Sequence, residues 1–205
     1  EQIDGLGMGL HHSPTLAKIF MAHHETKWLN ECPLGFKPVL YRRYVDDCFL
    51  LFKHESHANK FLNYLNDKHN NIRFTCELEN NLKLPFLDIL ITRDNTSFCT
   101  SVFRKQTFTG MAISLFSHCD FKYKLNCIKT LICRGFRICS SFHSVHLEFV
   151  FLKNFFKNNG YPHSLIDKCV CKFLKDSFQG CQISTARKKR FLYLFAIFWV
   201  PIGET

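Results

Sequence analysis

The spacing of apolar residues changes from one segment of the chain to the next. Apolar positions three to four residues apart are typical of amphipathic helices, and short apolar runs bounded by turn residues are typical of strands. This spacing predicts helices from about Ser13 to Leu29 and from about Ser56 to Lys68. It also predicts a strand–turn–strand hairpin over residues 39–52, and strands near residues 72–78, 84–92 and 97–104.

Beyond Gly110 the pattern is helical. Three stripes keep the 3-4 spacing: Leu125, Ile128, Ile132, Phe136 and Cys139; Leu147, Val150, Phe151 and Phe155; and Ile166, Cys169, Val170, Phe173 and Leu174. Asn158-Asn159-Gly160 is a helix stop, and Ser164 is a good cap for the third helix. Amphipathic helices with short connections form bundles. We therefore expect an α+β fold, with an antiparallel sheet and helices in residues 1–110, an all-α three-helix bundle in residues 111–190, and an apolar tail in residues 191–205.

The tetrad Tyr44-Val45-Asp46-Asp47 lies between the two apolar runs of the predicted hairpin. Successive strand residues point to opposite faces, so two neighbouring Asp side chains can act together only near a turn. Adjacent carboxylates suit Mg²⁺, which prefers oxygen ligands and shares its shell with substrate phosphates. Asp-Asp is also a common turn dipeptide, because short acids hydrogen-bond their own backbone. The flanking strands and the aromatic residue favour the metal-binding interpretation.

The charge balance indicates a polyanionic partner. The chain has a net charge of +10 and a pI near 9.1, and Lys and Arg gain affinity for nucleic acid by releasing phosphate counterions. Solubility and an anionic membrane surface are the alternative explanations. The hydrophobic fraction of 46% excludes a disordered chain. The residues that we expect to contact nucleic acid are Arg104, Lys105, Lys122, Lys124 and Lys129.

The cysteines and the apolar tail bear on where the protein resides. The eleven cysteines contain no Cys-x-x-Cys pair, although His163, Cys169, Cys171 and Cys181 are an alternative metal-ligand set. With no secretory signal peptide in the sequence, we expect reduced thiols and an intracellular location, nuclear or cytoplasmic. The apolar run from Phe191 to Val200 has half the length of a membrane-spanning helix. We expect it to form a buried strand or a hydrophobic edge, with no membrane as partner.

The hairpin segment Tyr41–Phe52 resembles the metal-binding hairpin of the polymerase palm in reverse transcriptases of the Penelope-like retroelement type. The resemblance covers about residues 2–190. Asp4–Gly9 and Ser13–Met21 are similar to the Gly-rich loop and helix that precede the hairpin in this family. Leu84–Ile91 and Ser101–Gly110 are similar to the strands that follow it, and Tyr123–Ile132 with Arg137–Ser140 to the helical region beyond the palm. Four ordered motifs are more specific than any one of them.

This resemblance implies a partial polymerase palm followed by a helical thumb or helix-turn-helix-like bundle, and an RNA-directed DNA polymerase activity. The residues that it assigns to the site are Asp46 and Asp47 as catalytic Mg²⁺ ligands, Tyr44 near the primer terminus, and Gly7, Met8 and Gly9 around the template and nucleotide pocket. The implied partners are an RNA template and a DNA primer.

The family supplies a further metal-binding Asp from a strand upstream of the Gly-rich loop. We expect that strand to belong to the missing N-terminal palm and fingers of a parent protein, so this chain alone is expected to be inactive as a polymerase. Asp88, inside the predicted strand 84–92, either replaces that ligand or pairs locally. Two other hypotheses stay open: a non-catalytic basic helical module at residues 120–180 that binds nucleic acid, and a decayed retroelement relic.

Overall fold

The structure is a computed structural model that describes residue 7 and residues 9–94, 97–178 and 193–201, the last range as backbone. It is an α+β protein, as expected. Contacts along the chain define two compact units: residues 1–80 together with 191–205, and residues 81–190. This division differs from the expected boundary at Gly110, because the strands within residues 81–110 group with the helices that follow Gly110. The expected division into functional domains stays a prediction.

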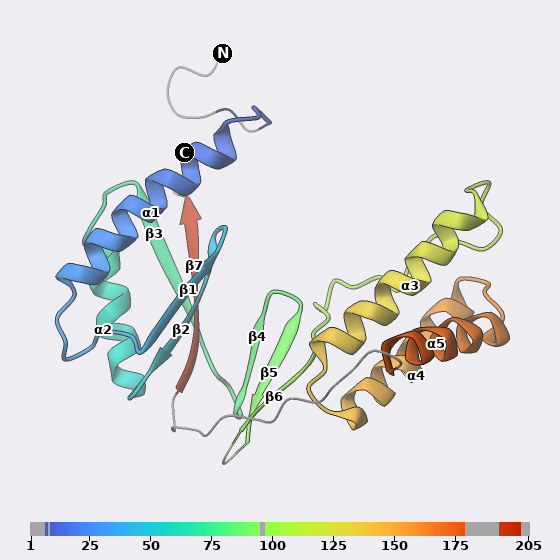
Figure 1. Cartoon of the computed structure of the whole chain (residues 1–205). Coiled ribbons are helices and arrows are strands. Elements are labelled where there is room, and N and C mark those ends of the chain that lie inside the picture. Colours follow the sequence, from blue (N-terminus) through green and yellow to red (C-terminus); the bar gives the residue numbers. More distant parts are fainter. Residues whose placement is uncertain (1–6, 8, 95–96, 179–192, 202–205) are drawn as a thin grey trace. The chain divides into compact units, whose positions relative to one another are not determined.

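The first unit consists of a four-stranded sheet and two helices (Figure 1). Its elements are α1 (Ser13–Glu31), β1 (Leu40–Tyr44), β2 (Asp47–Phe52), α2 (Glu55–Asn66), β3 (Ile72–Leu78) and β7 (Tyr193–Pro201). The strand order is β1-β2-β7-β3, and all neighbours are antiparallel. The predicted hairpin, both predicted helices and the predicted strand at 72–78 are thus confirmed, with ends displaced by one or two residues.

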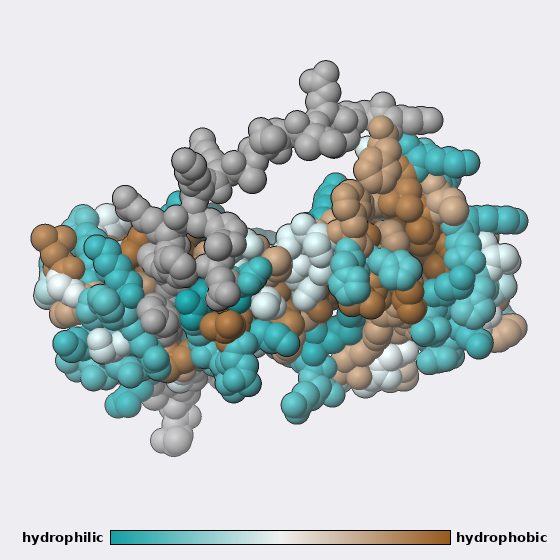
Figure 2. Space-filling model, turned by 90° about the horizontal axis from the view of Figure 1, so that it is seen from below, coloured by the Kyte–Doolittle hydropathy of each residue, from teal (hydrophilic) through white to brown (hydrophobic). Residues whose placement is uncertain are grey.

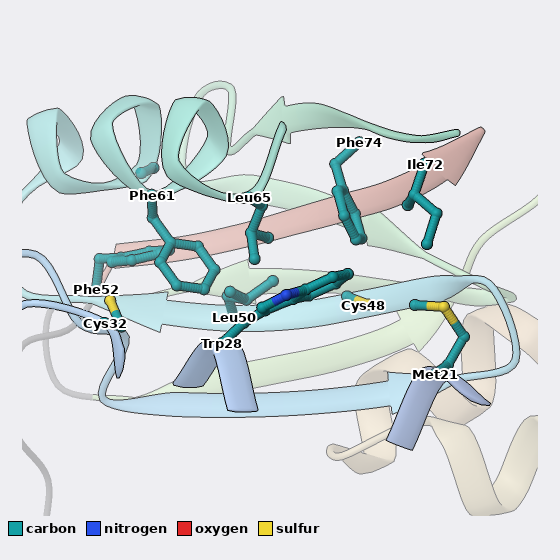
Figure 3. Close-up of a cluster of buried hydrophobic side chains, with 11 residues drawn as sticks. Met21, Trp28, Cys32, Cys48, Leu50, Phe52, Phe61, Leu65, Ile72 and Phe74 are labelled. Carbon is teal, nitrogen blue, oxygen red and sulfur yellow. The ribbon is translucent and has the colours of Figure 1, made fainter. Parts of the chain in front are cut away.

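One face of this sheet carries the core of the first unit. Along β2 every second residue is buried, so Cys48, Leu50 and Phe52 lie on the same face. They pack against side chains of both helices, including Trp28 of α1 and Phe61 of α2 (Figure 3). The helices are also joined directly, because the Tyr64 hydroxyl donates to the Trp28 carbonyl at 2.9 Å. Both helices therefore cover the same face of the sheet.

The apolar tail supplies a central strand. β7 pairs with β2 on one side and with β3 on the other, antiparallel to both. β2 and β3 therefore run parallel to each other, linked by α2 with one strand position between them, which is a split βαβ arrangement. The expectation of a strand in this segment is confirmed, and its position is central rather than at an edge. Within the described residues, no helix is long and apolar enough to cross a membrane.

The second unit begins with a three-stranded antiparallel meander, β4 (Lys83–Phe86), β5 (Ile89–Arg93) and β6 (Phe98–Val102). The prediction of one strand over 84–92 was wrong, because the chain reverses at Leu87-Asp88 and β4 pairs with β5. The apolar run hid this turn, since Leu87 takes a φ of 54° that its residue type does not favour.

Three helices follow: α3 (Phe121–Ile138), α4 (Phe142–Asn158) and α5 (His163–Phe178). The Asp120 and Ser141 side chains cap the first two helices by accepting from the amides of Lys122 and Ser144. The helix bundle is confirmed, and its core includes Ile128, Ile132, Leu152, Phe156 and Ile166. The third helix begins one residue before the predicted cap, Ser164.

The buried face of α4 differs from the predicted stripe. Leu147 and Val150 are 54% and 45% exposed, whereas Val145, Glu148 and Leu152 are buried. Apolar residues occur around the whole circumference of this helix, so their spacing did not define one face. The view in Figure 2 likewise shows apolar side chains gathered over the helical bundle. The burial of Glu148 was not predicted, and its ion-pair partner, Arg104, lies outside the helix.

Candidate active-site hairpin and nucleic-acid interface

The candidate active site is the two-residue turn between β1 and β2. Tyr44 pairs with Asp47 across the hairpin, so Val45 and Asp46 alone form the turn. Val45 has a φ of 57°, a conformation that is an outlier for a β-branched residue. Backbone strain of this kind persists only where the surrounding structure imposes it, and it concentrates at functional sites. Leu87 has a similar φ in the turn before Asp88, so strain alone does not single out the first turn.

Position on the sheet separates the acidic side chains from the core. Cys48 faces the helices, so its neighbour Asp47 faces the opposite side of the sheet. Tyr44 is directly across from Asp47 and shares that side, with 64% of its surface exposed. Asp46 is exposed at the tip. The two carboxylates and the Tyr44 ring therefore lie together at the end of the hairpin, as predicted, while their role as metal ligands stays a prediction.

The donor set at this tip fits a hard divalent cation only in part. Two adjacent carboxylates suit Mg²⁺, which keeps several waters and binds proteins through one or two carboxylates plus substrate phosphates. Across the sheet from Asp47, the paired position of β7 is Phe198, which offers no ligand. In the described part of the chain no group of three or more His, Cys, Asp or Glu residues is arranged to hold a metal ion. Phosphate oxygens, water or another carboxylate would have to complete the coordination shell of a cation bound at this tip.

A buried polar network supports the hairpin from the helix side. Glu25 of α1 is 9% exposed, and its Oε1 accepts from the Tyr41 hydroxyl and from Arg43 Nε, both at 2.6 Å. The Tyr41 oxygen also lies 3.3 Å from Cys48 Sγ. Burial, with the neighbouring Cys48 and Glu25, raises the pKa of Tyr41, and burial raises the pKa of Cys48 to about 12. Both groups are therefore neutral at ordinary pH, and the ion pair carries the only charges of this network.

Arg43 connects this network to the turn. Its Nη1 donates to the Val45 carbonyl at 2.8 Å, so the Arg43 side chain links α1 to the strained Val45. Sequence reasoning did not identify Glu25. The signal that was available is its position four residues after Met21 and three before Trp28, which are both buried, so the helical period places a carboxylate on the core face.

Two glycines of the Gly-rich segment, Gly7 and Gly9, are described and lie just before α1. The Gly7 carbonyl accepts from the Ser13 hydroxyl at 2.8 Å, so the Ser13 side chain bonds to this segment and does not cap the helix. Gly9 has a φ of 99°, which favours glycine. Met8, the third residue predicted for this pocket, lies outside the described residues.

The predicted nucleic-acid-binding residues of the second unit have different surroundings. Lys122 and Lys129 are exposed on α3. Lys124 is 6% exposed, and its Nζ donates to the carbonyls of Leu115 and Ser117 at 2.7 Å each. Its ammonium group therefore already has hydrogen-bond partners inside the protein. Of the three predicted lysines on α3, only Lys122 and Lys129 are accessible to solvent and hence to a ligand.

The other two predicted residues follow β6. Arg104 forms an ion pair with the buried carboxylate of Glu148, and its guanidinium carbon lies 3.6 Å from the centre of the Phe151 ring. Lys105 is exposed. Asp88, which had two interpretations, forms an ion pair with a distant residue of α3: its Oδ2 lies 2.9 Å from a guanidinium nitrogen of Arg134.

The connection between α4 and α5 is a short, fixed turn. Gly160 has a φ of 87°, and the Tyr161 hydroxyl donates to the Ile113 carbonyl at 2.6 Å. The Asn159 side chain accepts from the Ala112 amide at 2.9 Å and donates to the Gly110 carbonyl at 3.0 Å. A Gly-containing turn of this length between two helices is the signature of a helix-turn-helix. The exposed residues of the second helix, α5, are Ser164, Asp167, Lys168, Cys171, Lys172, Lys175, Asp176 and Phe178.

Comparison with known protein families agrees with this geometry. Residues 112–170 match the animal helix-turn-helix domain, a range that contains α3, α4 and the first half of α5. The chain thus has a helix-turn-helix region of the kind that binds nucleic acid, and the expected helix-turn-helix-like bundle is confirmed. The match fits a DNA-binding helical region and does not identify a reverse transcriptase. Comparisons with curated proteins and with solved structures gave no match.

Proposed function

We propose that this chain is part of a reverse transcriptase of the Penelope-like retroelement type, an RNA-directed DNA polymerase. The observation that carries the proposal is the hairpin tip, where Asp46 and Asp47 follow a strained Val45 and lie beside the exposed Tyr44 ring. The arrangement of the antiparallel sheet supports it, because both described helices of this unit lie on the face opposite Asp47.

In this proposal each residue of the tip has a separate task. Asp46 and Asp47 hold Mg²⁺, which would activate the primer 3′-hydroxyl and offset the charge that develops on the triphosphate. Tyr44 contacts the primer terminus next to the carboxylates. Arg43 and Glu25 fix the turn from behind, so that the carboxylates keep their positions. Gly7, Met8 and Gly9 shape the pocket for template and nucleotide.

The cation-binding step is testable without catalysis. Mn²⁺ is a paramagnetic substitute for Mg²⁺, and it should selectively broaden the amide NMR signals of residues 44–48. The variant Asp46→Asn/Asp47→Asn should abolish this broadening. Asp67→Asn, which removes an exposed acid elsewhere in the same unit, is the matched control and should leave it intact. Broadening that is absent from the hairpin, or unchanged in the double variant, would contradict the proposal.

A primer-extension assay addresses the whole reaction. Because β7 places Phe198 opposite Asp47, we expect no templated synthesis from this chain by itself. Efficient extension would show that Asp46 and Asp47 are sufficient for catalysis, and it would contradict the prediction that the chain alone is inactive.

A second function is favoured by the helix-turn-helix match: binding of duplex nucleic acid through the bundle, independent of any chemistry. Lys122 and Lys129 are exposed on α3, and Lys168, Lys172 and Lys175 on α5. Lys side chains on a bundle surface neutralise phosphates and fix the register of the protein on the duplex without reading bases. The RNA–DNA hybrid of template and primer is the substrate that joins the two proposals.

Salt titration tests this binding function. The logarithm of the binding constant for a labelled hybrid should fall linearly with the logarithm of the salt concentration. The variant Lys122→Glu/Lys129→Glu should reduce the steepness of that line by about two, one unit for each lost phosphate contact. Lys27→Glu/Lys60→Glu makes the same charge change on exposed positions of the first unit and serves as the control. Equal effects of the two variants would rule out a specific surface on the bundle.

A further inference from the structure

The second unit contains a cavity of about 280 Å³ that belongs to neither proposed site. It lies between the segment that follows β6 and the facing sides of α3 and α4. Its apolar lining includes Leu131, Leu152 and four phenylalanines, and its charged lining consists of Asp88, Arg104, Lys105, Arg134 and Glu148. All of these residues belong to the second unit.

One wall of this cavity is aromatic. Phe151 and Phe155 are stacked, with ring centres 6.1 Å apart and planes 16° apart. Phe108 lies against Phe155, at 5.7 Å between ring centres, and is 46% exposed. Aromatic side chains with an accessible face bind unstacked bases by stacking, and this interaction tolerates any base because each has a π-face.

The charged groups are mostly committed to one another. Arg104 pairs with Glu148, and Arg134 pairs with Asp88 at 2.9 Å. Both acids of the lining are thus neutralised by an arginine. Among the described residues Lys105 forms no ion pair, and it is exposed at the rim. An anionic group attached to a ring in the cavity would therefore meet an available cation at Lys105.

Arg134 also connects the cavity with a basic surface. Together with Lys129 and Arg137 it lines an open hollow of about 550 Å³ along α3. A phosphate backbone that follows this hollow would pass the mouth of the cavity. Ligand pockets generally have volumes of roughly 300–1,000 Å³, so this cavity suits one ring system and not a larger ligand.

We propose that this cavity, the Phe108 pocket, binds a single unstacked nucleobase, with the attached phosphate at Lys105. The inference rests on the proposed binding of nucleic acid by the second unit and extends it from duplex to a single-stranded nucleotide next to the duplex. Arg104, held by Glu148 and Phe151, is a positioning residue that keeps the aromatic wall in place.

Saturation-transfer NMR on the full chain tests the pocket directly. Adenosine 5′-monophosphate should show transfer to its base protons, and adenosine should bind more weakly because it lacks the phosphate. Base stacking on an aromatic side chain contributes roughly 1–3 kcal/mol, so Phe108→Ala should weaken nucleotide binding at least fivefold. Phe142→Ala removes another exposed ring, outside the cavity, and should have no effect. Lys105→Gln should reduce the affinity for the nucleotide to that for adenosine.

The outcomes separate this inference from the proposed function. Absence of transfer to the base protons, or equal binding by Phe108→Ala and the parent chain, would overturn the pocket assignment even if hybrid binding kept its salt dependence. Conversely, nucleotide binding that depends on Phe108 and Lys105 would support the pocket even if Lys122→Glu/Lys129→Glu left hybrid binding unchanged. Lys105 is exposed, so its substitution should leave the fold intact. If Phe108→Ala disturbs the packing of the bundle, the result for Lys105→Gln still tests the pocket.

Discussion

Glu25 Oε1 lies 2.6 Å from Arg43 Nε, in a contact where both side chains are nearly buried. Arg43 in turn donates to the Val45 carbonyl at 2.8 Å. The first helix is thus connected through one ion pair to the turn that carries Asp46. Removing one partner of a buried pair leaves the other charge without compensation in a medium that solvates it poorly.

We predict that Glu25→Ala lowers the free energy of unfolding by about 3 kcal/mol, because Arg43 and the Tyr41 hydroxyl both lose their acceptor. Urea denaturation followed by circular dichroism measures the change. Glu31→Ala removes a carboxylate from an exposed pair with Lys68 and should have a much smaller effect. The double variant Glu25→Leu/Arg43→Met should recover much of the loss, and a double variant as unstable as Glu25→Ala would contradict the assignment of the loss to an unpaired charge.

The hairpin and its acids could be predicted because the information is local. Two apolar runs around Tyr44-Val45-Asp46-Asp47 define the strands, and the structure pairs Tyr44 with Asp47. The pairing of Glu25 with Arg43 could not be predicted in this way, because the two residues are 18 positions apart and only the packing of α1 on the sheet brings them together. The burial of Lys124 could not be predicted from its helix either. A lysine in a helix is normally exposed, and only the carbonyls of the preceding loop make burial of this one favourable.

Val45 holds a conformation that costs a non-glycine residue roughly 1–2 kcal/mol, and its side chain is 70% exposed. Asn visits this backbone region readily without the unfolded-state entropy of glycine. We therefore predict that Val45→Asn raises the free energy of unfolding by about 1 kcal/mol. Val39→Asn, at an exposed position before the same hairpin, is the control. Chemical denaturation measures both, and a Val45→Asn variant that is no more stable than the parent would show that the turn is unstrained.

Gly135 of α3 lies against the side chain of Glu148 of α4, which pairs with Arg104. A Cβ atom at this position would lie 2.7 Å from Cγ of Glu148, too close for either to remain in place. Overpacking costs roughly 1–3 kcal/mol, which outweighs the gain in helix propensity of about 1 kcal/mol. We predict that Gly135→Ala lowers the melting temperature, whereas Gly35→Ala, where the new methyl group meets no atom within 4 Å, does not. A stabilised Gly135→Ala variant would mean that the helices are further apart.

Cysteine labelling reports on the bundle surface. Cys171 is exposed among the lysines of α5, and Cys99 is exposed on β6 of the same unit. We predict that N-ethylmaleimide modifies both residues quickly, and that bound hybrid slows the modification of Cys171 but not of Cys99. Cys48 should stay unmodified until the protein unfolds, because burial raises its pKa to about 12 and keeps the thiol protonated. Mass spectrometry of peptides measures the rates, and equal protection of Cys171 and Cys99 would argue against α5 as the contacting helix.

His24 gives the first unit a pH dependence whose sign follows from its surroundings. Partial burial lowers its pKa from the ordinary 6.5, and the neighbouring His69, His23 and Lys27 lower it further. The unfolded chain therefore takes up this proton at a higher pH than the folded chain does. The contribution of His24 to stability is complete above pH 6.5, decreases as the pH falls through the folded pKa and is constant below it.

We therefore predict that the melting temperature falls between pH 7 and pH 5, and that it falls less steeply in His24→Gln. His57, whose pKa is also lowered, acts in the same direction, so a residual slope should persist in this variant. His143→Gln changes an exposed histidine of α4 and should preserve the slope of the parent chain. Thermal melts across this pH range measure all three proteins. If the parent chain and His24→Gln had identical slopes, then the ring contacts of His24 with Phe20 at 4.4 Å and with Trp28 at 5.2 Å would not discriminate between its charged and neutral forms.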